Sequence, residues 1–353
     1  MMKKLFQDRL PRRDFLKFGA ISAAGLGWSF TPPAEILKTK PASEQYSSRL
    51  GRILLEKAFT YREPHFSSST VEGFQFNDLV EIEESVIGYS ESGQKNLWFA
   101  TVESDYIPAS SIQVVENRLN KVKETINPSG ELGEITVPYT SAFYNGEDNR
   151  KLDQQFYYGS THWIYSIGEH RINKNLFYLI KEDHWNDPYY VPAEHVHILS
   201  EDELKPVSVN KTVKQKKIKI DLKNQYLIAY EDDEPVLLSA LSSGYRTEEK
   251  DLRTPRGEFL INYKRPSRHM QHTDLFGSNN GELYGVPWVT YFTDSGVAFH
   301  GTYWHNDFSA PQSHGCINLP IPTAKWIYLW TDPSLDPRAK KITSQFGTPV
   351  EVI

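Results

Sequence analysis

An internal repeat constrains the fold of this chain more than any other feature. Each copy has an Asn-Leu-aromatic-aromatic tetrapeptide, a gap, a Tyr-x-Pro-Ala tetrapeptide and an aliphatic residue three positions later. The copies occupy 96–99, 106–109 and Ile112, and then 175–178, 190–193 and Val196. Repetition of the same segments in the same order marks two copies of one unit. Because the neighbouring runs are short and rich in β-forming residues, we expect two small β-barrels.

The end of each unit resembles bacterial SH3-like domains, since a strand and Tyr-x-Pro-Ala are followed by a short turn and a last apolar residue. The resemblance implies two SH3-like modules, at 46–116 and 133–200, which would bind cell-wall polymer. The segment 117–132 between them is polar and reads as a linker, with a short helix expected over 117–125.

A second linker is predicted at 201–216, and it is rich in lysine. Its lysines and Lys217 either attract an anionic wall polymer or merely keep a connector in solvent.

The N-terminus has the order of an export signal. Six basic residues between Lys3 and Lys17 precede a weakly apolar stretch, 18–30, which is too short to span a membrane. Arg12-Arg13-Asp14-Phe15-Leu16-Lys17 resembles the twin-arginine signal, although Pro11 stands where Ser or Thr is usual. We therefore expect a signal region at 1–35, engagement of the twin-arginine export machinery and an extracytoplasmic location in the cell envelope.

The overall charge argues against one class of partner. Asp and Glu number 45 against 39 Lys and Arg, for a net charge of −6. A chain without a global basic footprint is not expected to bind nucleic acid.

The remainder, 217–353, is predicted to be a mainly β catalytic domain with one short helix. Ile218, Ile220 and Leu222 alternate with polar residues, as in a half-buried strand. Further strands are expected at 226–230, 236–241, 259–263, 288–292, 297–299 and 348–353. The helix is expected over 322–330, with Ala324, Ile327 and Tyr328 on its buried face.

The only cysteine of the chain, Cys316, stands two residues after His314. A lone cysteine is often an inert buried residue, but a thiol beside an imidazole is the pairing that nucleophilic catalysis needs. We predict Cys316 as nucleophile, with a lowered pKa, and His314 as its base. Gly315 leaves room for substrate, and the amides of 314–316 are candidates for an oxyanion hole.

The block His300-Gly301-Thr302, followed by Ser313-His314-Gly315-Cys316-Ile317-Asn318, resembles the L,D-transpeptidase family, also called YkuD-like. Two upstream segments match in the family's order: Ser242-Ser243-Gly244, and Thr254-Pro255-Arg256-Gly257-Glu258-Phe259. The resemblance implies that the Gly301 carbonyl orients the catalytic base.

The resemblance also implies a reaction. Cys316 would form a thioester with a peptidoglycan tetrapeptide stem, release D-Ala and pass the acyl group to an amine of another stem, giving a 3→3 cross-link. Water as acceptor would make the protein an L,D-carboxypeptidase. The alternative from another class is a non-catalytic wall-binding protein that acts through its SH3-like modules.

Several other residues are candidates for the site. His300 would bind substrate or assist proton transfer, or only brace the loop. Ser313 and Asn318 would order the cysteine loop and contact substrate. Trp304 and His305 either line the site or have a purely structural role. Tyr284 and Trp288 are candidates for substrate binding as wall residues of an acyl-donor groove, although plain core is the favoured interpretation for both. Met270 is a further candidate, and the polar stretch 268–281 is a candidate lid.

A metal site is an alternative use of the same side chains. His300, His305, His314 and Cys316 are ligand types that zinc accepts, but their spacing matches no standard zinc pattern. We therefore expect neither a metal nor another cofactor.

Overall fold

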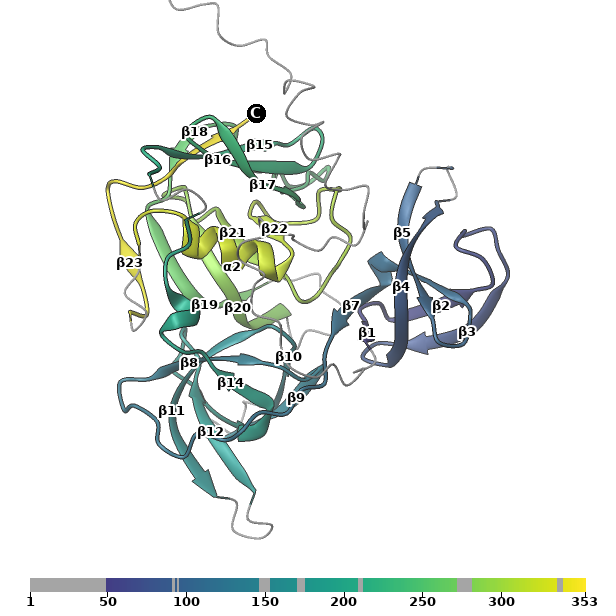
Figure 1. Ribbon diagram of the computed structural model, residues 1–353, viewed down its shortest axis with the longest axis horizontal. Coiled ribbons are helices and arrows are strands. Elements are labelled where there is room, and N and C mark those ends of the chain that lie inside the picture. The colour runs from purple at the N-terminus through teal and green to yellow at the C-terminus, as the bar shows by residue number, and fades with distance from the viewer. Residues whose placement is uncertain are drawn as a thin grey trace, which may run out of the picture.

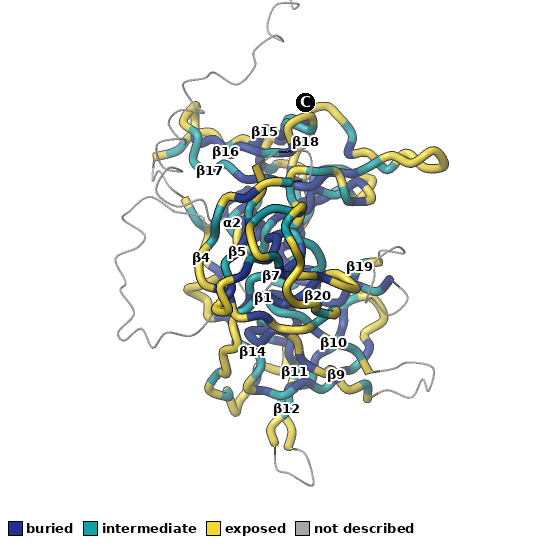
Figure 2. The backbone as a smooth tube through the Cα atoms, turned by 90° about the vertical axis from the view of Figure 1, so that its right-hand side faces the viewer, coloured by how far each residue is buried: buried dark blue, intermediate teal, exposed yellow. Residues whose placement is uncertain are grey.

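The computed structural model describes residues 49–90, 93, 95–145, 153–169, 175–208, 212–271, 281–334 and 339–353. The predicted signal region at 1–35 lies outside the described residues. Two seven-stranded sheets and two five-stranded sheets form three units in chain order (Figure 1). Buried backbone runs through the strands of all three, whereas connecting loops are mostly exposed (Figure 2).

The first unit is a single seven-stranded sheet in the order β3-β2-β6-β5-β4-β1-β7. Its strands are β1 (Arg49–Ile53), β2 (Lys57–Tyr61), β3 (Thr70–Gln75), β4 (Leu79–Tyr89), β5 (Lys95–Thr101), β6 (Tyr106–Pro108) and β7 (Ile112–Val115). A 3-10 turn, η1 (Ala109–Ser111), joins β6 to β7. Side chains such as those of Ile53, Ile107 and Ile112 are fully buried in its core.

The second unit repeats this topology, with the order β10-β9-β13-β12-β11-β8-β14. Its strands are β8 (Glu131–Ile135), β9 (Tyr139–Tyr144), β10 (Gln154–Tyr157), β11 (Thr161–Glu169), β12 (Leu176–Lys181), β13 (Pro188–Pro192) and β14 (Val196–Ile198). The Tyr-x-Pro-Ala segments lie at equivalent places, on the strand and 3-10 turn before the last strand, where η2 (Ala193–His195) matches η1. Two sheets with one strand order are what the sequence repeat predicts, and their SH3-like character stays a prediction.

The linkers differ in detail from expectation. The helix expected over 117–125 is wrong: this stretch carries no helix, and β8 begins at Glu131, inside the predicted linker. The second linker contains the 3-10 turn η3 (Asp202–Leu204) and ends where β15 starts at Lys216.

The third unit consists of two five-stranded sheets, β17-β16-β15-β24-β18 and β22-β21-β20-β19-β23. The first sheet contains β15 (Lys216–Asp221), β16 (Tyr226–Glu231), β17 (Glu234–Ala240), β18 (Gly257–Leu260) and β24 (Pro349–Val352). The second contains β19 (Tyr263–Gln271), β20 (Glu282–Tyr291), β21 (Ala298–Gly301), β22 (Ile317–Leu319) and β23 (Ile342–Thr343). This mainly β architecture confirms the predicted fold class.

The helix α2 (Ile321–Trp330) packs against β20 and β21. Ala324, Ile327 and Tyr328 are buried in the core of the third unit, as predicted. The predicted lid is partly wrong, since 268–271 belongs to β19, while 272–280 lies outside the described residues. In the described part of the chain no helix is long and apolar enough to cross a membrane.

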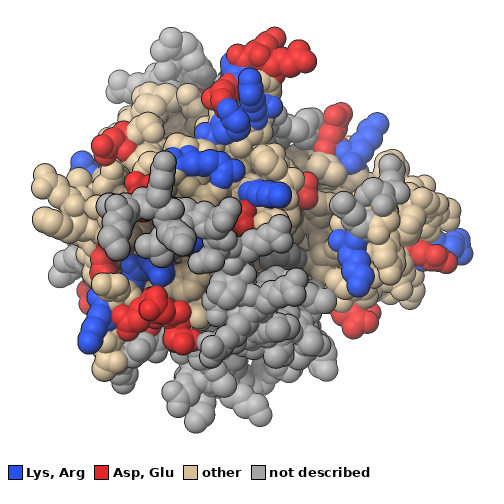
Figure 3. Space-filling model, turned by 90° about the horizontal axis from the view of Figure 1, so that it is seen from above, with Lys and Arg blue, Asp and Glu red and all other residues tan. Residues whose placement is uncertain are grey.

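On the face shown in Figure 3, several Lys and Arg side chains lie in the upper middle and a cluster of Asp and Glu side chains lies at the lower left.

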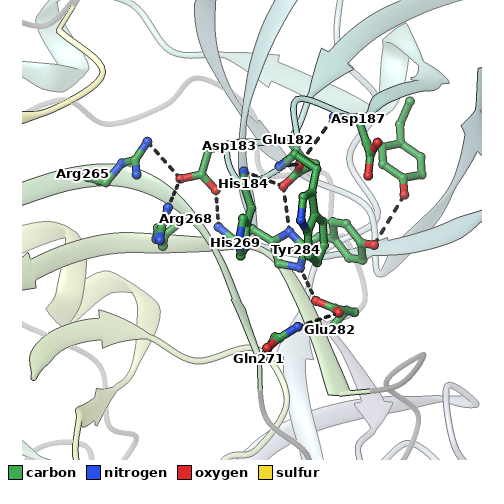
Figure 4. A network of polar contacts seen from close by, with 12 residues as sticks. Glu182, Asp183, His184, Asp187, Arg265, Arg268, His269, Gln271, Glu282 and Tyr284 are labelled. Carbon is green, nitrogen blue, oxygen red and sulfur yellow. Dashed lines mark hydrogen bonds and ion pairs between the residues drawn. The ribbon is translucent and has the colours of Figure 1, made fainter. Parts of the chain in front are cut away.

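A polar network joins the second unit to β19 and β20 of the third (Figure 4). Asp183 forms ion pairs with Arg265 and Arg268, both at 3.0 Å. Beside it, the buried ring of His269 lies between the carboxylates of Glu182, at 2.7 Å, and Glu282. The two units are therefore joined by buried charge as well as by apolar packing.

Candidate active site

Three segments far apart in the sequence meet at one place, and Thr254 joins them. Its hydroxyl donates to the Gly315 carbonyl at 2.8 Å and accepts the Gly244 backbone N–H at 3.0 Å. The carbonyl of Ser243 accepts the backbone N–H of Ser313, also at 3.0 Å. The backbone around the single cysteine is thus fixed by both upstream segments.

Two glycines at this junction are required for different reasons. A Cβ on Gly244 would lie 2.0 Å from the carbonyl oxygen of Leu252 and 2.8 Å from Cα of Gly315, so no side chain fits. A Cβ on Gly315 would meet nothing closer than 3.6 Å, but its φ of +123° is a conformation that L-residues rarely adopt. The first glycine therefore provides close approach and the second provides the turn.

Cys316 lies immediately before β22, with a half-buried side chain. Its Sγ is 3.9 Å from the carbonyl oxygen of Gly296. Burial raises the pKa of the Cys316 thiol, and a hydrogen bond from the backbone of Ala298 offsets this only in part. The lowered pKa expected for this thiol is therefore wrong for the protein without substrate, in which the thiol is the stable form.

His314 is exposed, and its ring is oriented by a neighbouring tyrosine. The Nε2 atom lies 3.1 Å from the hydroxyl of Tyr245, and the two ring centroids are 5.6 Å apart. Tyr245 directly follows Gly244, so the strand end that packs against the cysteine loop also orients the candidate base.

His300 is buried at the end of β21. Because β21 and β22 pair in parallel, His300 lies opposite Asn318, two residues after Cys316. Its Nδ1 is 3.1 Å from the Gly301 carbonyl. The family resemblance assigns this carbonyl to the base His314, whereas the contact observed here is with the ring of His300.

Ser313 closes the turn that carries the cysteine. Its hydroxyl donates to the Cys316 carbonyl and accepts the Gly315 N–H at 3.1 Å. Because the Gly315 amide already has an acceptor, the amides of His314 and Cys316 are the better candidates for an oxyanion hole.

Asn318, Trp304 and His305 lie around the same loop. The buried side-chain amide of Asn318 is 2.8 Å from Nε2 of His305, which places Asn318 as a support beneath the site. Trp304 packs in one apolar cluster with Cys316, and its ring centroid is 5.6 Å from that of His300. Both candidate wall residues, Trp304 and His305, are thus brought to the cysteine loop.

The other two candidate wall residues are core residues. Trp288 is 0% exposed and packs against Tyr328 in the main core. Tyr284 is 6% exposed and packs with the second unit, where its hydroxyl lies 3.4 Å from that of Tyr189. The substrate-binding role predicted for both is wrong, because these rings leave almost no surface for a ligand.

Sequence reasoning missed Tyr245, although its place directly after Ser242-Ser243-Gly244 was a usable signal. It also missed Tyr291, which packs with Met270 and Cys316 at the edge of one apolar cluster. The described residues contain no group of three or more His, Cys, Asp or Glu side chains that could hold a metal ion.

Residues 215–352 match the family model described as the YkuD L,D-transpeptidase catalytic domain. This part of the chain is therefore similar to L,D-transpeptidase catalytic domains. The match begins within two residues of the predicted boundary at 217 and contains all three motif segments that meet at Thr254.

One relative is also named as an L,D-transpeptidase. YciB of Bacillus subtilis (strain 168), whose name assigns it provisionally to the L,D-transpeptidases, is 30% identical over 128 residues. That match covers 33% of this chain and 62% of YciB, so the chain spans less than two thirds of that relative.

Solved structures of L,D-transpeptidases are also similar to part of this chain. An L,D-transpeptidase from Xylanimonas cellulosilytica is 27% identical, with a TM-score of 0.28, and covers 41% of this chain and 63% of its own. The catalytic domain of the L,D-transpeptidase from E. faecium is 24% identical, with a TM-score of 0.29, and covers 40% of this chain and 99% of its own.

Proposed function

We propose that this protein is an exported peptidoglycan L,D-transpeptidase with Cys316 as its nucleophile. The acyl donor is a tetrapeptide stem, the leaving group is D-Ala, and the acceptor is an amine of a second stem, which gives a 3→3 cross-link. The catalytic domain at 215–352 is the basis for the reaction class, and the geometry around Cys316 supports the assignment of residues.

The reaction takes place in two steps at the thiol. His314 accepts the thiol proton as Sγ attacks the carbonyl that precedes D-Ala, and the same proton passes to the departing amine. The thioester is then attacked by the acceptor amine, whose proton returns through His314 to the sulfur. The raised pKa of the Cys316 thiol is compatible with this sequence, because the proton leaves only when the base and the substrate are both in place.

One observation supports the assignment most strongly: the hydroxyl of Thr254 bridges Gly244 and Gly315. A chain that used its third unit only as a scaffold would gain nothing from fixing the backbone of a loop that carries a half-buried thiol and, two residues before it, an oriented imidazole. The Tyr245–His314 contact adds the orientation that a general base needs.

The amino-terminal part would bring the enzyme to its substrate. We propose that the twin-arginine-like segment directs export to the cell envelope, and that the two seven-stranded units act as SH3-like modules that bind wall polymer. The shared strand order of the two sheets supports their treatment as one module used twice.

Mass spectrometry of disaccharide-tetrapeptide incubated with the purified protein tests the reaction, with Cys316→Ala as the matched control. Loss of D-Ala together with a cross-linked dimer supports the transpeptidase. Loss of D-Ala without a dimer, when a second stem is supplied in excess, favours the L,D-carboxypeptidase instead.

A second measurement separates the enzyme from a wall-binding protein. Sedimentation with purified wall should be unchanged by Cys316→Ala, since binding would depend on the amino-terminal modules. If the protein sediments with wall and leaves every stem peptide intact while its thiol is reduced, the enzymatic proposal is rejected.

A further inference from the structure

Arg52 of the first unit lies at a junction of all three units. Its side chain is 1% exposed although it is charged. Within the first unit the guanidinium donates to Gln113 at 2.8 Å and to Asn77 at 2.8 Å. It also donates to the backbone carbonyl of Tyr303 in the catalytic domain, at 2.6 Å, and it covers the ring of Tyr157 in the second unit, at 4.5 Å.

The residues around Arg52 extend the same junction. The rings of Tyr157 and Tyr303 stack with centroids 5.5 Å apart. Gln113 donates to the Tyr158 carbonyl at 3.0 Å, which ties the first unit to the second. A separate contact reaches the catalytic domain, because the side-chain amide of Asn306 donates to the carbonyl of Ala109 at 3.0 Å. The first unit therefore holds the segment that contains Tyr303 and Asn306 at two points.

This segment connects the candidate catalytic residues. It begins directly after β21, which ends with His300 and Gly301, and it leads to the loop that carries Cys316. Thr302 donates its backbone N–H to the carbonyl of Leu319 in β22, at 3.0 Å. Trp304, which follows Tyr303, packs in the apolar cluster of Cys316. A displacement of Tyr303 would therefore also move the ring of Trp304 and the thiol of Cys316.

The chemistry of Arg52 suits the positioning of a segment better than a role limited to holding the units together. Each partner described for its guanidinium is neutral: two side-chain amides, a main-chain carbonyl and an aromatic ring. Burial lowers its pKa to about 10. A buried charge without a carboxylate is costly, whereas a planar fork of donors can fix several acceptors in one geometry.

We propose that Arg52 is a positioning residue for the transfer reaction, because its guanidinium fixes the Tyr303 carbonyl and with it the segment between His300 and Cys316. This inference rests on the proposed function of Cys316. It makes the first unit a structural part of the active site, in addition to any binding of wall polymer.

Full-length Arg52→Lys and Arg52→Met variants test the proposal, with Arg118→Met as the control. Arg118 is an exposed arginine whose ion pair with Glu116 is 3.6 Å long. For Arg52→Met we expect kcat to fall about tenfold with KM changed less than about twofold, because misplacement affects reactivity more than binding. Arg52→Lys should recover part of kcat, and Arg118→Met should match the wild type.

Hydrogen exchange of the 302–306 amides gives a readout that needs no activity. Both Arg52 variants should exchange faster in this segment than the wild type at a temperature where each is folded. If Arg52→Met does not fold, Arg52→Lys and Asn306→Ala carry the test, each with faster exchange at 302–306 and lower kcat. Folded variants with wild-type exchange and wild-type kcat would overturn the proposal.

The same design separates two kinds of failure. If the wild type does not process stem peptides, the proposed function fails, while the alkylation rate of Cys316 by iodoacetamide still reports on the loop. A Cys316 alkylation rate in Arg52→Lys that differs at least threefold from wild type then supports positioning. An unchanged rate with unchanged exchange rejects it.

Discussion

The hydroxyl of Tyr245 lies 3.1 Å from Nε2 of His314, on the exposed side of the candidate base. This contact occupies Nε2 of the ring and leaves Nδ1 as the nitrogen proposed to accept the thiol proton. When Nε2 carries the proton and donates to the phenol, Nδ1 is left as the acceptor that a general base requires. Tyr245 thereby has a defined role in the reaction proposed for Cys316.

Tyr245→Phe should lower kcat about tenfold while KM stays within about twofold, because the ring of His314 loses its orienting partner and not its place in the chain. Steady-state kinetics with a tetrapeptide donor measure this. Tyr106→Phe, in β6 of the first unit, is the matched loss of one hydroxyl and should have no effect. Equal kinetics for the two variants would remove Tyr245 from the mechanism.

Substitution of the two glycines at the cysteine loop should have different effects, on stability for Gly244 and on activity for Gly315. Gly244→Ala forces a Cβ to 2.0 Å from the Leu252 carbonyl, so the backbone must move and the melting temperature should drop sharply. Gly315→Ala has room for its Cβ but must hold φ near +123°, at a cost of about 1–3 kcal/mol. We expect Gly315→Ala to fold and to lose most of its activity.

Thermal melts followed by activity assays separate the two substitutions. Gly93→Ala provides a control, because Gly93 also has positive φ, at +76°, yet lies in an open turn of the first unit. Activity in Gly315→Ala equal to that of Gly93→Ala would show that the turn at Gly315 does not position the thiol.

The raised pKa of the Cys316 thiol predicts slow alkylation in the absence of substrate. At pH 7 a smaller fraction should be thiolate than in a free cysteine, whose pKa is about 8.5, and the rate should inflect above that value. The pH dependence of labelling by iodoacetamide, normalised to free cysteine, measures this. An inflection at or below that of free cysteine would mean that the resting protein already stabilises the thiolate.

The catalytic loop could be predicted from sequence because its chemistry is local. The hydrogen bonds from Ser313 to Cys316 and from Gly315 to Ser313 lie within the short motif, whereas the contacts with Thr254 and Ser243 that also hold this loop do not. The sequence could not decide whether Trp288 lines a groove or lies in the core, since aromatic residues are found in both. Only the packing of α2 and β20 decides that its ring is 0% exposed.

The arrangement of the three units was beyond sequence reasoning for a similar cause. Arg52 and Tyr303 are 251 positions apart in the sequence. Nothing in the type of either residue predicts that the two will be in contact. The repeat predicted two modules but not their contact with the catalytic domain. Consequently, deletion of the amino-terminal units would remove the Tyr303 contact as well as any wall-binding surface.

The network in Figure 4 is the other junction that only the structure reveals, and it makes stability depend on pH. Burial alone would lower the pKa of His269, but hydrogen bonds and charge from Glu182 and Glu282 raise it. Burial alone would raise the pKa of Glu182, but hydrogen bonds from His269 and two backbone amides lower it to about 2. Asp183 lies beside this pair and forms ion pairs with Arg265 and Arg268.

The sign of each effect follows from linkage. A raised His269 pKa gives stability that is complete below about 6.5 and is lost as pH rises through the folded value. A lowered Glu182 pKa gives stability that is present above about 4.5 and is lost as pH falls towards 2. His269→Gln should therefore flatten both limbs of a plot of melting temperature against pH. The control His65→Gln changes a half-buried histidine of the first unit and should keep both limbs. If His269→Gln also kept both limbs, the buried pair would not hold the second unit to β19 and β20.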